Sequence, residues 1–150
     1  MRAFEVMTGD VRTVAPETPA EEAWELMRRE RIRHLVVMRG KTVAGLLSER
    51  DAGGRAGTGV RKGRTVADLM TPRVVTVSPT DTVRVVANAM RGRTIGCVPV
   101  LKDRRLVGIV TVSDLLDLIG RGVARPAQPE RRGLSHRVPH RKRRTARAAW

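Results

Sequence analysis

The sequence predicts an α+β fold built from two similar halves, followed by a basic C-terminal segment. Three observations carry this prediction. The chain repeats itself at an offset of 63 positions, so that residues 6–51 align with residues 69–114 without a gap. Each copy shows strand and helix patterns in the order β-α-β-β-α, while residues 121–150 show neither pattern. Because one copy would expose a face of a small sheet, we expect two pseudo-symmetric repeats packed through their sheets.

The first two elements of each repeat are a short extended segment and an amphipathic helix. In repeat 1 the segment Thr13-Val14-Ala15-Pro16 precedes Thr18 as the predicted N-cap, Pro19 at the first helical position and Glu21 closing a capping box. In repeat 2 the segment is Thr76-Val77-Ser78-Pro79 and the predicted cap is Asp81. Apolar residues at helical spacing predict the buried faces, which are Ala20, Ala23, Trp24 and Met27 in repeat 1 and Val83, Val86, Ala87 and Met90 in repeat 2.

A β-hairpin and a second helix complete each repeat. The predicted strands span residues 34–38 and 42–47 in repeat 1, and residues 97–101 and 106–110 in repeat 2. Repeat 2 then continues with a clear helix over residues 112–119, stopped by Gly120. Repeat 1 has Ala52-Gly53-Gly54 at this point, and five glycines within residues 53–63 predict a loop. We therefore place repeat 1 at 6–54, a glycine-rich connector at 55–68, repeat 2 at 69–120 and a disordered Arg-rich tail at 121–150.

The composition limits the possible functions. No apolar run approaches the roughly 20 residues of a membrane span, and residues 1–5 lack the apolar stretch of a signal peptide, so we expect a cytoplasmic protein with no membrane contact. Cys97 is the only cysteine, which excludes an internal disulfide and predicts a buried thiol. His34, His136 and His140 are too scattered to suggest a zinc site.

The net charge of +15 is concentrated in the tail. Residues 1–120 carry 20 basic and 14 acidic side chains, whereas residues 121–150 carry ten basic side chains and only Glu130. Such a segment could bind nucleic acid or an acidic protein surface through electrostatic attraction. Alternatively, it is a solvated basic tail.

Both hairpins end on one pattern, in which a glycine, two apolar residues, a hydroxyl residue and two variable residues precede an aspartate. The two instances are Gly45-Leu46-Leu47-Ser48-Glu49-Arg50-Asp51 and Gly108-Ile109-Val110-Thr111-Val112-Ser113-Asp114. A strand that leads into a helix N-terminus offers N–H groups and a positive dipole end to a phosphate, and a carboxylate one turn later can accept hydrogen bonds from a ribose diol. The same residues fit a capping box that satisfies only the backbone. Both interpretations remain open at the level of the residues.

Together with the Met70-Thr71-Pro72 opening and the Thr-Val-x-Pro strand ends, these patterns resemble a tandem pair of CBS domains, a Bateman module, over roughly residues 6–119. The resemblance implies two ligand clefts between the repeats. It implies adenosine-containing ligands such as AMP, ADP, ATP or S-adenosylmethionine, and assembly into a homodimer.

The resemblance also implies roles for individual residues. Asp51 and Asp114 would bind the ribose, with Ser48 and Thr111 near the phosphate. Each cleft would be completed by the other repeat, so that Asp51 faces Val75, Ile95 and Gly96, and Asp114 faces Arg12, Ile32 and Arg33. The two arginines would pair with phosphate, or they extend into water. Arg50 is a further phosphate candidate, and Leu46, Ile109 and Ser113 complete the predicted set of ligand-binding residues.

The repeats differ in ways that predict unequal sites. Repeat 1 has Gly9 where repeat 2 has Pro72, and Val36 where repeat 2 has Pro99. The glycines after Asp51 weaken the helix whose N-terminus would hold a phosphate, so we expect the Asp114 site to be the more dependable one.

Neither repeat contains a nucleophile–base pair or a metal cluster, so we expect a regulatory module rather than an enzyme. The predicted function is a stand-alone ligand sensor that requires no cofactor and takes an adenine nucleotide as its regulatory ligand. The alternative is a dimerisation platform whose basic tail binds nucleic acid or an acidic protein. A third hypothesis is a module that has lost its ligand and acts through protein contacts alone.

Overall fold

The computed structural model describes residues 1–93 and 95–121, which form the predicted α+β fold. The chain divides into two compact units. The first, which we call the Asp51 unit, is Val11–Val74. The second, the Asp114 unit, joins Met1–Asp10 to the chain from Val75 onward. The expected disordered tail, apart from Arg121, lies outside the described residues.

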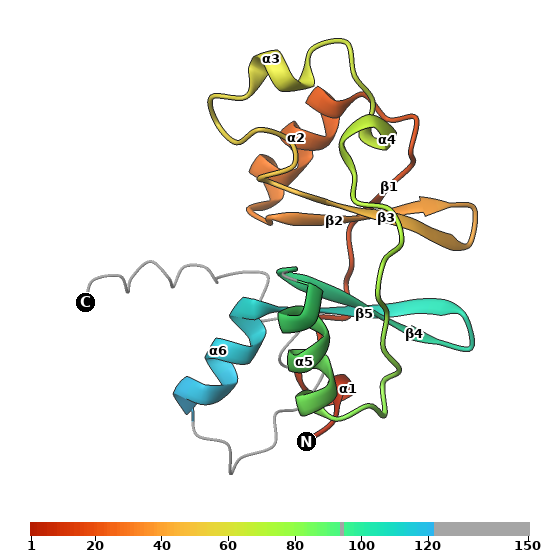
Figure 1. Cartoon of the computed structure of the whole chain (residues 1–150), viewed down its shortest axis with the longest axis vertical. Helices are drawn as coiled ribbons and strands as arrows, with labels where there is room; N and C mark the ends of the chain where they lie inside the picture. Colours follow the sequence, from red (N-terminus) through yellow and green to blue (C-terminus); the bar gives the residue numbers. More distant parts are fainter. Residues whose placement is uncertain (94, 122–150) are drawn as a thin grey trace. The chain divides into compact units, whose positions relative to one another are not determined.

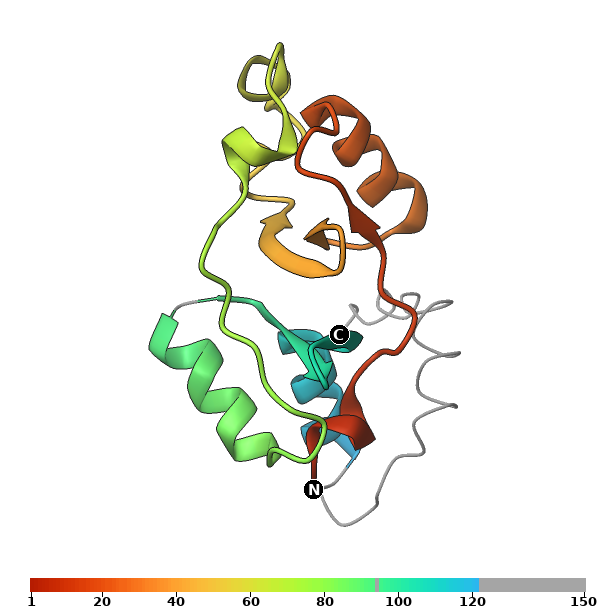
Figure 2. The ribbon, with the colours of Figure 1, turned by 90° about the vertical axis from the view of Figure 1, so that its right-hand side faces the viewer.

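In the Asp51 unit, three helices lie on one face of a three-stranded sheet (Figures 1 and 2). The strands are β1 (Thr13–Val14), β2 (His34–Arg39) and β3 (Thr42–Ser48), with β1 parallel and β3 antiparallel to β2. The helices are α2 (Ala20–Glu30), α3 (Thr58–Arg61) and α4 (Val66–Leu69). The core of the unit comprises the buried residues Ala23, Trp24, Met27, Leu35, Val37, Leu47, Ala52 and Val66.

The Asp114 unit repeats this arrangement with one more long helix (Figure 1). Strands β4 (Cys97–Lys102) and β5 (Arg105–Thr111) form an antiparallel hairpin, and Val77 makes a parallel bridge to Val100. Helices α1 (Ala3–Val6), α5 (Val83–Arg93) and α6 (Val112–Arg121) pack against the hairpin. Helix α6 continues through Gly120, which therefore does not stop it as predicted. Cys97 is buried, as expected.

Each copy opens with a short leader that pairs with the hairpin of the other copy; the two leaders are residues 1–8 and residues 64–71. Residues Met7 and Thr8 follow α1, and Thr8 exchanges two backbone hydrogen bonds with Ile109 of β5, at 2.9 and 3.0 Å. Thr71, after α4, makes the equivalent exchange with Leu46 of β3, at 2.8 and 3.0 Å. This pairing is the reason that Met1–Asp10 belongs to the unit built mainly from repeat 2.

The leaders also cap the first long helix of each unit, and this overturns the predicted caps. The Ala20 N–H donates to the Arg64 carbonyl at 2.8 Å, and the Thr18 side chain makes no capping hydrogen bond. In the Asp114 unit the Val83 N–H donates to the Met1 carbonyl at 3.0 Å. Thr82 Oγ1 also accepts from the Val85 N–H at 3.2 Å, whereas Asp81 accepts from the Ser78 N–H. Local sequence could not show this, because the backbone partner of α2 lies more than forty residues away in the chain.

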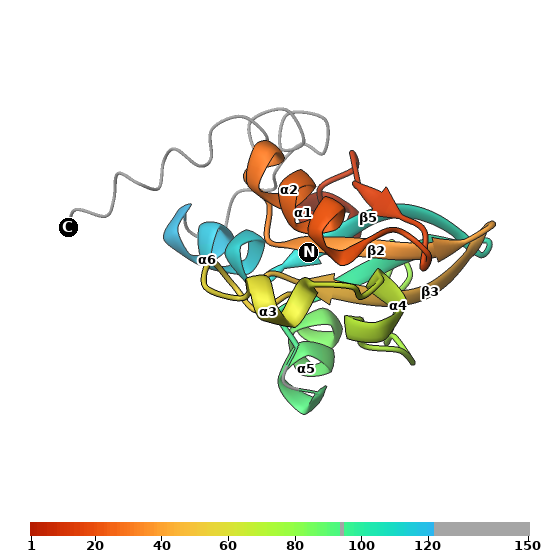
Figure 3. The ribbon, with the colours of Figure 1, turned by 90° about the horizontal axis from the view of Figure 1, so that it is seen from above.

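The segment predicted as a loop is held in place by a buried arginine. Arg61, on α3, is 2% exposed, and its guanidinium lies 4.3 Å from the centre of the Trp24 ring. Its Nη1 donates to the carbonyls of Ala52 and Gly54, both at 2.8 Å, and its Nε donates to Glu21 at 2.8 Å. Helix α3 lies toward the open end of the β2–β3 hairpin, away from its turn (Figures 1 and 3). Arg61 thus stabilises the loop that stands where repeat 2 has α6.

We predict that Gly45→Ala destabilises the fold by about 1–3 kcal/mol, because a Cβ atom there would lie 2.8 Å from the Thr71 carbonyl oxygen and 2.6 Å from Met70 Sδ. Urea denaturation measures the change. Gly92→Ala in α5 is the matched control, since nothing lies within 4 Å of its added Cβ and alanine favours a helix. Wild-type stability of the Gly45 variant would contradict the close approach of the leader.

We also predict that Arg61→Ala lowers the free energy of unfolding by about 2–3 kcal/mol, because it strips two carbonyls of their donor and exposes a buried ring. Arg64→Ala serves as the control. Arg64 is exposed and its side chain donates only to the Val60 carbonyl at 3.2 Å, so its loss should cost about 0.5 kcal/mol or less. Equal losses of unfolding free energy in the two variants would show that Arg61 does not hold the loop in place.

Candidate ligand-binding site

The two glycine-to-aspartate patterns fold into reciprocal capping boxes. Asp51 Oδ2 accepts from the Ser48 N–H at 3.0 Å, while Ser48 Oγ accepts from the Asp51 N–H at 3.0 Å. Asp114 Oδ2 accepts from the Thr111 N–H at 2.8 Å, and Thr111 Oγ1 accepts from the Asp114 N–H at 3.3 Å. The hydrogen bonds expected of a capping box are therefore present in both patterns. In each box a single oxygen, Oδ2, satisfies the backbone, and the carboxylate is held in one orientation.

A capping box alone does not identify a ligand site, because similar boxes occur elsewhere in this chain. Thr65 and Asp68 form another one at the start of α4, with the Thr65 N–H donating to Asp68 Oδ2 at 2.8 Å. Asp81 accepts from the Ser78 N–H in the same way at 2.8 Å. What distinguishes Asp51 and Asp114 is their position directly after the last strand of a hairpin.

The two boxes lead into different backbone structures. Thr111 is the residue before α6, so its box stands at the N-terminus of a ten-residue helix, and Asp114 is 3% exposed. Ser48 is followed by turns through Gly53, and Asp51 is partly exposed. The glycines after Asp51 have thus replaced a helix with a loop, as their number suggested.

The structure places the residues before each hairpin beside the box of the same unit. The Glu49 N–H donates to the Arg33 carbonyl at 2.8 Å, and the Val112 N–H donates to the Gly96 carbonyl at 3.0 Å. Ile32 and Ile95, one position earlier, make matching bonds to the ends of α2 and α5. Ile32 and Arg33 therefore lie next to the Ser48–Asp51 box, and Ile95 and Gly96 lie next to the Thr111–Asp114 box. The predicted lining of each cleft by the other repeat stays a prediction.

The remaining predicted residues are distributed along the same elements. Leu46 and Ile109 are buried and pair with the two leaders. Arg12 lies before β1, where its carbonyl accepts from the Val36 N–H at 3.3 Å, and Val75 occupies the matching position of the Asp114 unit. Arg50 and Ser113 are exposed, each inside its box.

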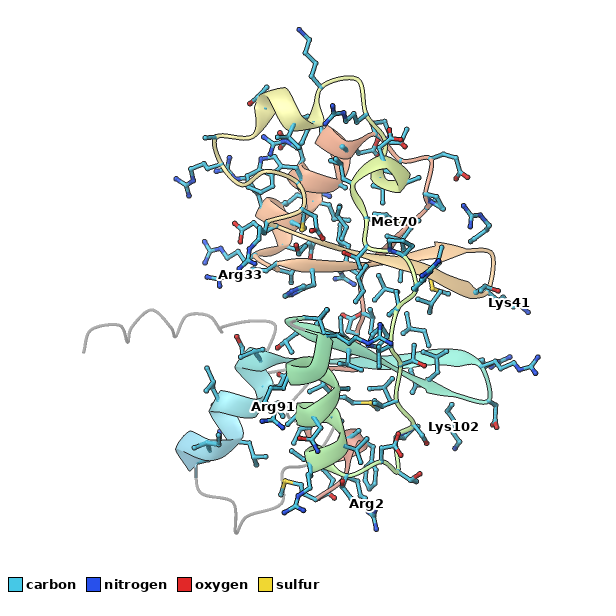
Figure 4. The ribbon with its side chains drawn as sticks, in the orientation of Figure 1. Arg2, Arg33, Lys41, Met70, Arg91 and Lys102 are labelled. Carbon is cyan, nitrogen blue, oxygen red and sulfur yellow. The ribbon has the colours of Figure 1, made fainter. Side chains whose placement is uncertain are left out.

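Arg12 and Arg33 each contact an acidic side chain. Arg12 Nε lies 3.3 Å from Glu30 Oε1, and Arg33 Nε lies 3.7 Å from Glu49 Oε1. The Arg33 side chain is 81% exposed, and it emerges at the opposite end of the hairpin from Lys41 (Figure 4). Both pairs are accessible to solvent, and such pairs contribute little to stability.

His34 is a site residue that the sequence prediction missed. It is partly buried at the start of β2, and its partner across the hairpin is Ser48. Burial lowers the pKa of His34 from 6.5 to about 4, with Asp51 opposing the shift and Arg33 adding to it. The imidazole is therefore neutral at pH 7. The predicted hairpin already placed His34 opposite Ser48, and this pairing is the signal that could have identified His34 as a neighbour of the box.

The described residues offer no cluster of three His, Cys, Asp or Glu side chains that could hold a metal ion. Within the same residues, every helix is too short or too polar to cross a bilayer.

Comparison with known proteins extends the similarity over both repeats. A CBS domain-containing protein of Bacillus subtilis, YhcV, is 30% identical over 112 residues, which cover 74% of this chain and 80% of that protein. An inosine-5'-monophosphate dehydrogenase of Korarchaeum cryptofilum is 33% identical over 115 residues, but the chain spans only 23% of that enzyme. Similarity to this and other enzymes is thus confined to a minor part of their length.

Among solved structures, the CBS domain pair of protein MJ0100 in complex with 5'-methylthioadenosine and S-adenosyl-L-methionine superimposes with a TM-score of 0.73. The two chains are 27% identical, and the match covers 81% of this chain and 97% of that one. The sequence model of the CBS domain matches residues 3–52 and 66–121. The chain therefore belongs to the CBS-domain family, and it carries two copies of the domain.

Proposed function

We propose that this chain is a regulatory module that senses adenosine-containing ligands through its two Ser/Thr-x-x-Asp boxes. One observation carries the proposal. Both boxes present an oriented aspartate at the end of a hairpin, in a fold that matches a CBS domain pair solved with two adenosine compounds. The Thr65–Asp68 box at the start of α4 does not follow a hairpin strand, and we take this difference to distinguish a candidate site from an ordinary helix cap.

An aspartate held in this way suits a ribose. A carboxylate accepts hydrogen bonds at two oxygens, and the two neighbouring hydroxyls of a ribose are donors at matching spacing. In each box Oδ2 is occupied by the backbone N–H of Ser48 or Thr111, so the aspartate cannot turn away. The aspartate is therefore oriented before a ligand binds, and less side-chain entropy is lost on binding.

Regulation would follow from a difference in affinity. A ligand shifts a protein between two states only as far as it binds one of them better. The glycine-rich loop after Asp51 is one element that ligand binding could bias, because Arg61 holds it by two hydrogen bonds to carbonyl groups.

We infer that the chain acts as a sensor and not as an enzyme. Ser48 and Thr111 use their hydroxyls as caps, and His34 is the only histidine near either box in the described part of the chain. His34 lies opposite Ser48, but the Ser48 hydroxyl is engaged with the Asp51 N–H. We place the module in the cytoplasm, and we expect it to form a homodimer.

The alternative function concerns the basic tail. Binding of nucleic acid or of an acidic protein through residues 121–150 remains a prediction from charge, and that segment beyond Arg121 lies outside the described residues.

The proposed function predicts that AMP, ADP, ATP, S-adenosylmethionine or 5'-methylthioadenosine raises the unfolding temperature of the full chain. At a hundredfold excess over Kd, a single site stabilises the folded state by about 2.7 kcal/mol. Thermal unfolding with each ligand at millimolar concentration measures the effect. Asp51→Asn and Asp114→Asn should each remove the contribution of one site, because asparagine can still accept the backbone hydrogen bond but replaces a carboxylate oxygen with a donor.

Asp68→Asn is the matched control for these two variants. It alters a capping box with the same backbone hydrogen bond at α4, away from both hairpin ends, so it should leave every ligand-induced shift intact. The proposal fails if no adenosine compound stabilises the wild type, or if both site variants keep the full shift.

His34 makes the stability of the Asp51 unit depend on pH. Its pKa is 6.5 in the unfolded chain and about 4 in the folded one, so a proton favours the unfolded state between these values. The folded state therefore loses stability as the pH falls from about 6.5 to 4, and this group has no effect above pH 7.

We predict that lowering the pH from 7.5 to 5 costs the wild type about 1–2 kcal/mol more than it costs His34→Gln. Glutamine does not titrate, so subtracting the two curves isolates the histidine from the carboxylates. Urea denaturation at the two pH values gives the comparison. Parallel losses in the two proteins would show that the His34 pKa is not lowered on folding.

A further inference from the structure

We infer that Arg61 is a positioning residue for the Asp51 site: its guanidinium fixes the turn that follows Asp51, and ligand binding at this aspartate depends on that turn. The inference rests on the proposed function and adds what sets the affinity of one of the two sites. Its basis is the set of hydrogen bonds that hold residues 48–54, all of which lie within the Asp51 unit.

The turn after Ser48 begins like a helix but does not continue as one. The Ala52 N–H donates to the Ser48 carbonyl at 3.1 Å, which is the four-residue spacing of an α-helix. The N–H groups of Gly53 and Gly54 donate to carbonyls three and five residues back, at 2.9 and 3.1 Å. Both glycines have positive φ angles, 88° and 66°, so the backbone leaves the helical conformation there. A single turn with no helix after it is unfavourable on its own.

Arg61 supplies hydrogen-bond donors that a continuing helix would have supplied. Its Nη1 donates to the carbonyls of Ala52 and Gly54, both at 2.8 Å. These carbonyls stand at the C-terminal end of the turn, where the peptide dipoles favour a cation. The guanidinium is fixed in its turn by the Glu21 carboxylate and the Trp24 ring, which both belong to α2. Arg61 therefore ties the turn to the long helix of the unit.

Arg61 acts on Asp51 through the main chain. Its side chain is 2% exposed, and in the described part of the chain no hydrogen bond or ion pair joins it to Asp51. Ala52 is fully buried and adjacent to Asp51, so holding the Ala52 carbonyl fixes the backbone on both sides of that residue. Asp51 Oδ2 belongs to the box, while Oδ1 accepts no hydrogen bond from any described residue. The direction in which Oδ1 faces a ligand thus depends on the backbone that Arg61 holds.

This arrangement couples the guanidinium to the ligand. Without it the turn would sample other conformations, and a ligand would have to order the turn on binding, which lowers its affinity. Because such coupling is reciprocal, a bound ligand would also oppose opening of the turn. The Thr111–Asp114 box leads directly into the ten residues of α6, so binding there should not respond to Arg61.

Titration calorimetry with AMP, ATP, S-adenosylmethionine and 5'-methylthioadenosine tests the inference in chains that keep one site each. Asp114→Asn leaves the Asp51 site, and Asp51→Asn leaves the Asp114 site. Adding Arg61→Met removes the donors but keeps an apolar side chain beside Trp24. It should weaken binding at least tenfold in the first background and less than twofold in the second.

Val37→Ala is the matched control for a general loss of stability. It truncates a fully buried side chain of the same unit, at the β2 position that pairs with Gly45 and not with the box. It should therefore weaken binding at the Asp51 site less than threefold.

Amide hydrogen exchange gives a readout that a general loss of stability would not reproduce. In Arg61→Met the amides of Ala52, Gly53 and Gly54 should exchange at least tenfold faster relative to the amides of β2. In the Asp114→Asn chain, a ligand that binds should slow exchange at the same three amides. This last measurement keeps Arg61 in place, so it holds even where Arg61→Met does not fold.

The outcomes separate this inference from the function on which it rests. If none of the four compounds binds the wild type, the proposed function fails and the inference fails with it. The inference alone is overturned if the wild type binds but the Asp114→Asn chain does not. It is also overturned if Arg61→Met and Val37→Ala weaken binding equally, or if a bound ligand leaves exchange at residues 52–54 unchanged.

Discussion

The pairing of each leader with the opposite hairpin is the interaction on which the rest of the structure depends. Thr8 and Thr71 each exchange two backbone hydrogen bonds with a hairpin strand. The carbonyls of Met1 and Arg64, in the same leaders, accept from the first N–H groups of α5 and α2. The close approach explains the glycine of each pattern. An added Cβ at Gly45 would meet Met70 and the Thr71 carbonyl, and one at Gly108 would meet Met7. These glycines serve the fold, so the candidate site begins with the hydroxyl residue three positions later.

The two units show how one repeat can lose a helix and remain packed. In the Asp114 unit, α6 supplies Leu118 to the core. In the Asp51 unit, the equivalent stretch is a glycine-rich loop, and a cation from α3 reaches into the space between that loop and Trp24. Burying an arginine requires partners for most of its donors, and two carbonyls, a carboxylate and an indole ring provide them. The loop that carries Asp51 is consequently held by side-chain chemistry instead of by a helix.

The sequence was sufficient for features that depend on local periodicity. The predicted hairpin strands agree with β2 to β5 to within one residue at every end, and all four residues predicted for the buried face of α2 are buried. Features set by distant partners were missed. The cap of α2 is a carbonyl of the leader, and Arg61 has no local pattern that marks it as buried. The one hint in the sequence was Trp24, which stands where repeat 2 has Ala87. A ring in place of a methyl group indicated that α2 contacts a group that α5 does not, and this group is Arg61. The boxes at Asp51 and Asp114 were predictable, but the neighbours that each box acquires depend on tertiary contacts.

Because the leaders are exchanged, the structural units of this protein do not coincide with its sequence repeats. A fragment that begins with repeat 2 lacks Met1–Asp10, and with it the strand partner of Ile109 and the acceptor for the Val83 N–H. A fragment that holds only repeat 1 before α4 lacks the partner of Leu46. Neither half alone holds the backbone partner of its own hairpin. In this sense the tandem chain is the covalently joined form of a strand-exchanged dimer of single repeats.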